Sequence, residues 1–433
     1  MSKKLSKRQK QAKRQKQQKQ SANKPKTSSR KAMVDLIERL GLMDAFTQCP
    51  KNIQDLLIAS RNPSPKIVLA ADSEEDLDLN SIRSRIKEWS RTALIQFANW
   101  PLEISVDDYY RNACPLLLFY NKLKRGSHGR EDRPLFLDAA EQLFDDGVQM
   151  DVTVMKALEA ACRSLSYQAT LFNQRIVTWD ISYLDATFPK RPLALSFRAT
   201  KPKVNYVMSD GKRRKSYQAG FPMYGHKIRW HELEASFFGL PSDEPLPVYV
   251  QSHVIDRLRS RLQPRSATTY SFSVFHNSVG LPHVVKQEHG VTWLEARSVP
   301  GRRIGYFLIE PADGVALVKT FLFLTMKGTP ESERLYRILG ARKDDIEHLE
   351  LDKLETFMKP DVVKDKGLAE MFRKCGCEQL LELHSEFLFD DEPDQGDAKA
   401  IKTYQAPSKA FVGRRPEAPQ GIHASDIRLP RVD

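Results

Sequence analysis

The chain has 433 residues, 41% of them hydrophobic, and a formal net charge of +13 at pH 7. This length accommodates two or three domains, each with its own hydrophobic core. The five cysteines show neither CxxC spacing nor an even framework, so we expect a reducing compartment and no structural zinc. The chain also contains no P-loop, dinucleotide-binding, HExxH or GxSxG motif, and the sequence therefore gives no support to those enzyme classes.

The net positive charge is concentrated in residues 3–31, which contain 13 Lys and Arg and no Asp or Glu. A polycation of this density binds phosphate backbones by releasing condensed counterions, independently of base sequence. We therefore predict a disordered basic arm over residues 1–32 that contacts RNA or the ribosome, with DNA as a second candidate partner. A solubilising tail with no specific partner is the alternative interpretation. The arm residues assigned to nucleic-acid binding are Lys3, Lys4, Lys7, Arg8, Lys10, Lys13, Arg14 and Lys16.

Membrane association is not expected. Leu5 is the one large aliphatic residue of the basic arm, which therefore has no apolar stripe for a bilayer interface. No segment resembles a signal-peptide core, and none approaches the roughly 18 apolar residues of a membrane-spanning helix. We expect a cytoplasmic protein without a membrane partner, and nothing in the sequence requires a cofactor.

Residues 33–174 show helical periodicity and are predicted to form an α-helical domain. Ile82, Ile86 and Trp89 recur at intervals of three and four residues, which indicates a helix with one apolar face. Asn80 or Ser81 is the expected N-cap of that helix. Further helices are predicted over residues 109–122, 135–144 and 152–172.

Residues 175–245 change to short β-type runs at 176–184, 193–197 and 204–208, so we predict a β-rich hairpin region. Ser209, Asp210 and Gly211 form a strong turn signal, because Asp-Gly supplies the positive φ angles of a tight hairpin. The basic hairpin fits contact with a phosphate backbone, and it fits equally an exposed edge strand protected by charge. The residues of its returning strand assigned to nucleic-acid binding are Lys212, Arg213, Arg214 and Lys215.

Residues 246–358 form the most informative folded stretch. A strand at 248–250 is followed by Ser252, placed as the N-cap of a helix that runs to Leu262. His253, Arg257 and Arg261 lie at successive i+4 positions on this helix. Strands are predicted next at 270–275, 283–287, 292–296, 303–309 and 315–324, followed by a helix that begins at Thr329 and Pro330 and ends near Gly340.

The predicted fold class is therefore α+β. A helical N-terminal domain precedes a mixed domain in which an antiparallel sheet packs against the helix that starts at Ser252. A helical segment is expected over 359–388, and residues 389–433 lose periodicity and are predicted to be an extended C-terminal tail.

The order of a strand, an S-H-x-x-x-R-x-x-x-R helix and a multi-stranded sheet carrying Arg and Lys resembles the small RelE/BrnT-type toxin fold over residues 246–358. The resemblance implies an endoribonuclease that needs no metal and acts on free or ribosome-bound RNA. It also implies that basic side chains of the sheet and helix hold the scissile phosphate and that the RNA 2′-hydroxyl is the nucleophile.

Cleavage through a 2′-hydroxyl requires a base, an acid and cations that stabilise the phosphorane. His253 fits the base or acid role because imidazole titrates near neutral pH, and arginines can clamp a phosphate bidentately. Lys319 interrupts the apolar run at 315–324, where strand alternation places it on the same face as Leu317. The candidate catalytic residues are His253, Lys319, Arg257, Arg261, Arg303 and Tyr306, with Arg302 as a further candidate for the phosphate clamp.

Structural roles compete with each of these assignments. His253 also fits the first turn of a surface helix, and the helix arginines fit pairing with Asp256 and Glu295. Lys319 fits a sheet edge or a snorkelling position as well as a site beside Arg303 and Tyr306. The alternative function is a non-catalytic, nucleic-acid-binding subunit of a nucleoprotein or ribosome-associated assembly with an unidentified protein partner.

Overall fold

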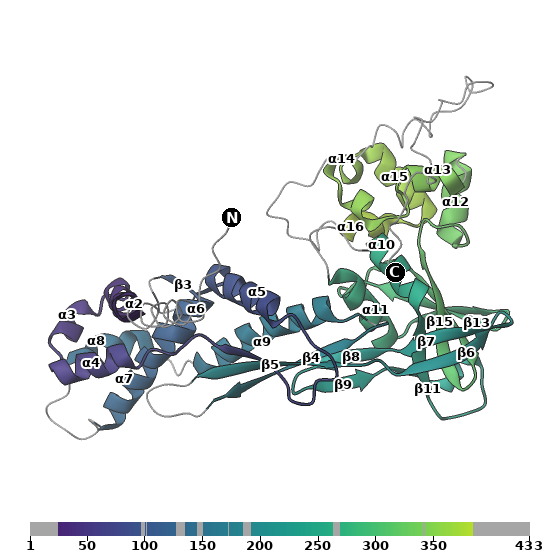
Figure 1. Cartoon of the computed structure of the whole chain (residues 1–433). Coiled ribbons are helices and arrows are strands. Elements are labelled where there is room, and N and C mark those ends of the chain that lie inside the picture. The colour runs from purple at the N-terminus through teal and green to yellow at the C-terminus, as the bar shows by residue number, and fades with distance from the viewer. Residues whose placement is uncertain are drawn as a thin grey trace, which may run out of the picture. The chain divides into compact units, whose positions relative to one another are not determined.

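The computed structural model describes residues 25–96, 100, 102–126, 135–144, 150–171, 173–184, 192–262, 269–340 and 343–383 (Figure 1). These residues divide into two compact units. The first comprises the described residues within Met1–Arg257, Thr268–Leu294 and Phe307–Thr320. The second comprises those within Leu258–Ala267, Glu295–Tyr306 and Phe321–Asp433.

The N-terminal part of the first unit is mainly helical, as the periodicity of residues 33–174 predicts. Asp78, rather than the predicted Asn80 or Ser81, caps α5, because its carboxylate accepts hydrogen bonds from the amides of those two residues at 3.1 and 3.0 Å. The helical elements are α2 (Pro25–Arg39), α3 (Met43–Thr47), α4 (Lys51–Ala59), α5 (Leu79–Thr92), α6 (Val106–Asp108), η1 (Tyr109–Ala113), α7 (Cys114–Gly126), α8 (Leu135–Phe144) and α9 (Met150–Ala169).

Helix α2 begins at Pro25 and therefore includes part of the segment predicted as a disordered arm. Residues 1–24, which contain the arm lysines and arginines assigned to nucleic-acid binding, lie outside the described residues. The predicted C-terminal tail, residues 389–433, also lies outside the described residues. In the part of the chain that the structure describes, no helix has both the length and the apolar character needed to cross a membrane.

The first unit also contains a three-stranded sheet, in the order β1 (Lys66–Leu69), β5 (Leu193–Thr200) and β4 (Ile176–Tyr183). Strand β1 pairs with β5 in parallel and β4 pairs with β5 antiparallel, with Asp180 opposite Ser196. The hairpin of β8 (Gly220–Met223) and β9 (Lys227–Trp230) meets β4 through a bridge between Trp179 and Tyr224. The remaining small sheet pairs β2 (Leu94–Gln96) with β3 (Glu103–Ser105).

The largest sheet is mixed, so the prediction of an antiparallel sheet is wrong for one pair of strands. Strand β15 pairs in parallel with β11, because the chain returns beside β11 after three intervening strands. The order is β12 (Val284–Glu288), β13 (Val291–Arg297), β14 (Arg303–Ala312), β15 (Val315–Phe323), β11 (Leu246–Gln251), β7 (Lys212–Gln218) and β6 (Val204–Ser209), and β10 (Glu232–Leu233) pairs with β11.

Helix α10 (Ser252–Leu262) follows β11 as predicted. The predicted strand at 270–275 is instead part of helix α11 (Tyr270–Gly280). Aromatic and β-branched residues favoured a strand, but Phe272, Phe275 and Val279 also recur at helical spacing, and all three are buried. Tertiary burial therefore overrides local propensity in this segment.

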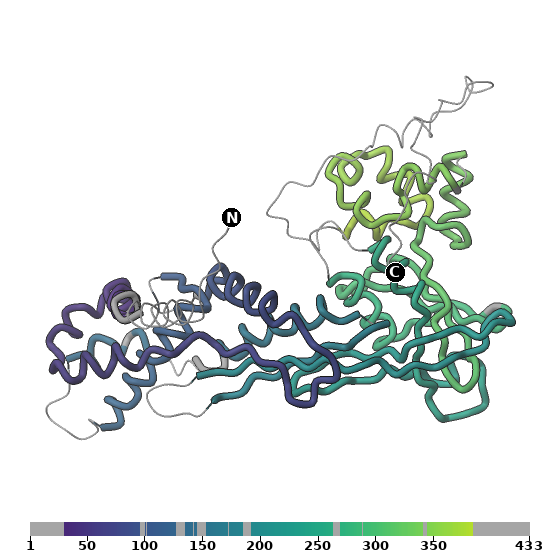
Figure 2. The backbone as a smooth tube through the Cα atoms, in the orientation of Figure 1, coloured from purple at the N-terminus to yellow at the C-terminus, as the bar shows by residue number. Residues whose placement is uncertain are grey.

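The second unit ends in a group of short helices, shown in yellow-green in Figures 1 and 2. Helix α12 begins and ends as predicted: Thr329 accepts a hydrogen bond from the Ser332 amide at 3.1 Å, and Gly340 adopts a φ of 62° at the C-cap. The elements are α12 (Pro330–Leu339), α13 (Lys343–His348), η3 (Leu354–Met358), α14 (Pro360–Val363), α15 (Lys366–Cys375) and α16 (Glu378–Glu382), and the short η2 (Ala235–Phe238) belongs to the first unit.

Candidate functional site

Lys319 lies in an interior strand, because β15 is hydrogen-bonded between β14 and β11, which excludes the sheet-edge alternative. Its ammonium donates to a carboxylate oxygen of Asp210 at 2.7 Å and pairs with Glu310 at 3.0 Å. Burial by itself lowers the pKa of Lys319, but the hydrogen bonds to the two carboxylates outweigh it and the pKa is raised. Lys319 is therefore a cation whose charge is already balanced by two acids.

His253 is exposed in the first turn of α10. Its pKa is lowered, first by partial burial and then by the positive charges of Arg257 and Arg214, while a hydrogen bond with the backbone of Lys319 opposes the shift. The Arg257 guanidinium donates to the hydroxyl of Thr320. His253 is thus a neutral imidazole at pH 7 within the field of two arginines.

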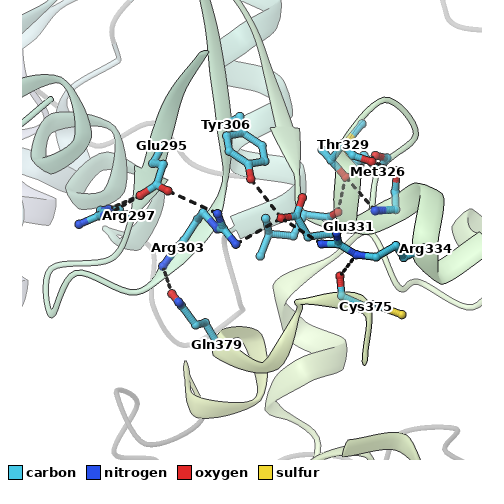
Figure 3. A network of polar contacts seen from close by, with 12 residues as sticks. Glu295, Arg297, Arg303, Tyr306, Met326, Thr329, Glu331, Arg334, Cys375 and Gln379 are labelled. Atoms are coloured by element: carbon cyan, nitrogen blue, oxygen red, sulfur yellow. Dashed lines mark hydrogen bonds and ion pairs between the residues drawn. The ribbon is translucent and has the colours of Figure 1, made fainter. Parts of the chain in front are cut away.

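Arg303 is held between two carboxylates of the second unit (Figure 3). Its guanidinium lies 3.4 Å from an oxygen of Glu295 and 3.2 Å from an oxygen of Glu331. The phenol of Tyr306 donates to the same Glu331 oxygen at 3.2 Å, and Arg297 donates to Glu295 at 2.6 Å. Figure 3 shows these side chains meeting from β13, β14 and the start of α12.

The burial of Glu295 and Glu331 explains why cations and hydrogen-bond donors surround them. The side chains of Glu295 and Glu331 are only 7% and 4% exposed, and an isolated buried carboxylate is costly unless cations and donors surround it. Burial and the neighbouring Glu331 charge also raise the pKa of Tyr306, which keeps its phenol protonated as a donor. Arg303 and Tyr306 are brought together, but both contact Glu331, whereas Lys319 contacts Asp210 and Glu310.

Two other predicted arginines, Arg261 and Arg302, also contact acids. Arg261 pairs with Asp352 rather than with Glu295, and the Nε of Arg302 donates to Glu382 at 3.1 Å. The predicted catalytic residues therefore do not form one cluster within one compact unit: His253, Arg257 and Lys319 belong to the first unit, and the remainder belong to the second unit.

The basic hairpin has the turn that its sequence predicts. Asp210 and Gly211 adopt φ angles of 50° and 71°, and β6 and β7 pair from Ser209 and Lys212 outward. Strand β6 is the last strand of the large sheet. All four residues from Lys212 to Lys215 are exposed, and no ion pair is formed by any of them among the described residues.

One face of this hairpin also carries exposed apolar side chains that the sequence analysis did not single out. Val204, Tyr206 and Met208 are 45%, 51% and 48% exposed, and strand alternation places them on the same face. Lys215 is directly opposite Tyr206 in the register, and the Arg213 guanidinium lies 5.7 Å from the Tyr206 ring centroid. Arg213 and Lys215 share this face, while Lys212 and Arg214 project from the opposite one. We call the three apolar residues together with the four cations of Lys212–Lys215 the hairpin surface.

The sequence contained a signal for these residues. Alternation along 204–208 puts every second side chain on one face, but it does not say which face is covered. Val207 is buried because it packs in a cluster with Val315 and Leu317, while its neighbours Tyr206 and Met208 face the other way and are exposed.

No protein-family model, curated protein or solved structure matches this chain. Among the described residues, no group of three or more His, Cys, Asp or Glu side chains is arranged to hold a metal ion.

Proposed function

We propose that this protein binds RNA through its sugar-phosphate backbone and that the hairpin surface makes the contact in the folded part of the chain. The observation that carries the proposal is the run of four exposed cations at Lys212–Lys215, of which Arg213 and Lys215 share a face with the exposed ring of Tyr206. Lys and Arg neutralise phosphates and release counterions, and an aromatic face stacks on an unpaired base.

The charge distribution supports this surface over the predicted catalytic cations. Arg303, Arg261 and Lys319 each contact at least one carboxylate, which cancels the positive potential that a phosphate would meet. The cations of β7 keep their charge available to solvent. RNA is preferred to DNA on the resemblance of residues 246–358 to RNA-cleaving toxins, and stacking on Tyr206 favours single-stranded segments, whose bases are accessible.

Fluorescence anisotropy with a single-stranded RNA oligonucleotide tests the proposal. Replacing Lys212, Arg213, Arg214 and Lys215 together by Ala should weaken binding at least about tenfold and reduce the slope of log affinity against log salt by roughly two or more. The control replaces Arg373 and Lys374 by Ala, because these exposed cations of α15 already pair with Glu370. Equal affinities of the two variants would contradict the assignment of the hairpin surface.

A second candidate function, metal-independent RNA cleavage, is supported by the surroundings of His253. Its lowered pKa provides a neutral base at pH 7, and Arg257 and Arg214 provide nearby positive charge for a phosphorane. Incubation with RNA in EDTA should then give 2′,3′-cyclic phosphate ends, and His253→Ala should lower the rate by about 100-fold or more with affinity retained. Intact RNA after prolonged incubation would favour the non-catalytic, nucleic-acid-binding alternative.

A further inference from the structure

A serine and a histidine are hydrogen-bonded on the three-stranded sheet of the first unit. The Oγ of Ser196, in the central strand β5, lies 2.8 Å from the Nε2 of His226, in the turn between β8 and β9. Both side chains are partly exposed. None of the predicted RNA-binding or RNA-cleaving residues belongs to this pair.

The second ring nitrogen of His226 determines which nitrogen carries the proton. Its Nδ1 lies 3.3 Å from the Oγ1 of Thr178, and the Thr178 hydroxyl donates to the carbonyl of Arg198 at 3.4 Å. With the Thr178 proton in that bond, its oxygen accepts an Nδ1–H of the imidazole. In that tautomer the lone pair of Nε2 faces Ser196, which is the arrangement needed to take a proton from the serine hydroxyl.

The backbone of the turn fixes the position of the imidazole. His226 has a φ of 56°, which is uncommon for a residue other than glycine, and Gly225 before it has a φ of 71°. The His226 amide donates to the carbonyl of Trp179 at 3.2 Å, and the guanidinium of Arg198 donates to the His226 carbonyl. The turn is thus tied at both backbone groups to the strands that carry Ser196 and Thr178.

Burial of the imidazole favours the neutral form of His226. Its pKa is lowered mainly by burial and also by the positive charge of Arg198, while the carboxylates of Asp180 and Asp72 act in the opposite direction. Arg198 is itself paired with Asp72 at 2.8 Å. Arg198 and Asp180 both lie on the sheet face of Ser196, Arg198 two residues along β5 and Asp180 directly opposite on β4.

We propose that Ser196 and His226 form an acyl-transfer site that accepts carboxylic esters, with Ser196 as the nucleophile and His226 as its general base. The Ser196 oxygen forms a bond to the ester carbonyl carbon, and its proton passes to Nε2 of His226. Collapse of the tetrahedral intermediate breaks the bond to the alcohol, which leaves with that proton. Water activated by His226 then hydrolyses the acyl-serine and releases the carboxylic acid. Thr178 is a positioning residue, because it acts through the imidazole.

A fluorophosphonate probe tests the site in the full-length protein, because serine attack at phosphorus expels fluoride and leaves a stable adduct. The wild type should be labelled at Ser196 by peptide mass mapping, and Ser196→Ala should not be labelled there. His226→Asn should slow labelling about 100-fold or more, since it removes the base while Asn tolerates the left-handed backbone. Ser182→Ala is the matched control, because Ser182 lies on the same sheet face as Ser196 and should be dispensable.

The pH dependence of labelling separates catalysis from a structural role. The wild-type rate should be constant above about pH 7 and fall on acidification, as His226 takes up a proton below its ordinary pKa of about 6.5. Thr178→Val should lower the rate without loss of the circular dichroism spectrum. An unlabelled Ser196 in the wild type, or an unchanged rate in folded His226→Asn, would overturn the proposal. Either result leaves RNA binding by the hairpin surface untouched.

Discussion

The Nε2 of His231 lies 2.7 Å from the Nδ1 of His276 inside the first unit, so two buried imidazoles share one proton between facing nitrogens. Their side chains belong to residues only 4% and 3% exposed. Burial, with the positive charge of Arg229, lowers the pKa of His231 to about 4. Burial also lowers the pKa of His276, as do His231 and Arg229.

Acid should destabilise the first unit through this pair. Both pKa values are lower in the folded state, so the stabilisation is complete above the unfolded pKa of about 6.5 and is lost as pH falls toward 4. Below about pH 6, each histidine should cost about 1 kcal/mol of unfolding free energy per pH unit. Urea unfolding at pH 7.5, 6 and 5 measures the slope, which should be smaller in His276→Phe. An equal slope in that variant would assign the acid sensitivity to other groups.

Lys319→Met should destabilise the fold by about 1–3 kcal/mol, because it leaves the partly buried Glu310 without its cation. Thermal denaturation followed by circular dichroism gives the change. The variant Asp210→Asn should have a smaller effect, since the Asp210 side chain is 70% exposed and solvent screens it. A larger loss in Asp210→Asn than in Lys319→Met would contradict this ranking.

Arg303→Met should be among the most damaging substitutions in the second unit, with an expected loss of about 3–5 kcal/mol. It leaves Glu295 and Glu331 buried without the guanidinium that joins them. Arg303→Lys should recover only part of the loss, because one ammonium does not reproduce the fork that reaches both acids. Guanidinium chloride unfolding at pH 7.5 measures both variants, and full stability in Arg303→Lys would show that a single charge suffices.

Gly305→Ala should prevent normal pairing of β14 and β15. A Cβ at position 305 would lie 2.2 Å from the backbone oxygen of Leu322. The backbone of a paired strand cannot move aside in the way that the end of a flexible side chain can. We expect a loss of about 3 kcal/mol or more, or a failure to accumulate as folded protein. Gly126→Ala is the control, since nothing lies within 4 Å of the added methyl group and the residue ends a helix. Similar melting temperatures for the two variants would refute the steric argument.

Local signals in the sequence predicted much of the secondary structure. Asp210 and Gly211 indicated a tight turn, and Thr329 with Pro330 indicated a helix start, because these residues act through their own backbone. The parallel partner of β11 was not predictable from such signals. Pairing of β11 with β15 depends on contacts between residues nearly 70 positions apart, and no periodicity within either strand encodes its neighbour.

The candidate sites could not be predicted fully from the sequence either, because they too depend on contacts between residues distant in the chain. A sequence displays that Lys319 and Arg303 are charged, but it does not show that Asp210, Glu310, Glu295 and Glu331 fold onto them. Charge neutralisation is a tertiary property. Ser196 and His226 are 30 residues apart and lie in no common motif, so their hydrogen bond became visible only when the turn between β8 and β9 was placed over β5.

The contact between Asp210 and Lys319 has a consequence for the kinetics of ligand capture. Asp210 occupies the tip of the β6–β7 turn, and its carboxylate is anchored to an ammonium of an interior strand. The backbone that carries Lys212–Lys215 is therefore ordered before any ligand binds. Binding of a phosphate then costs little conformational entropy of the chain. Such a prearranged surface captures its ligand at a rate limited by encounter and electrostatic steering, without a folding step after contact.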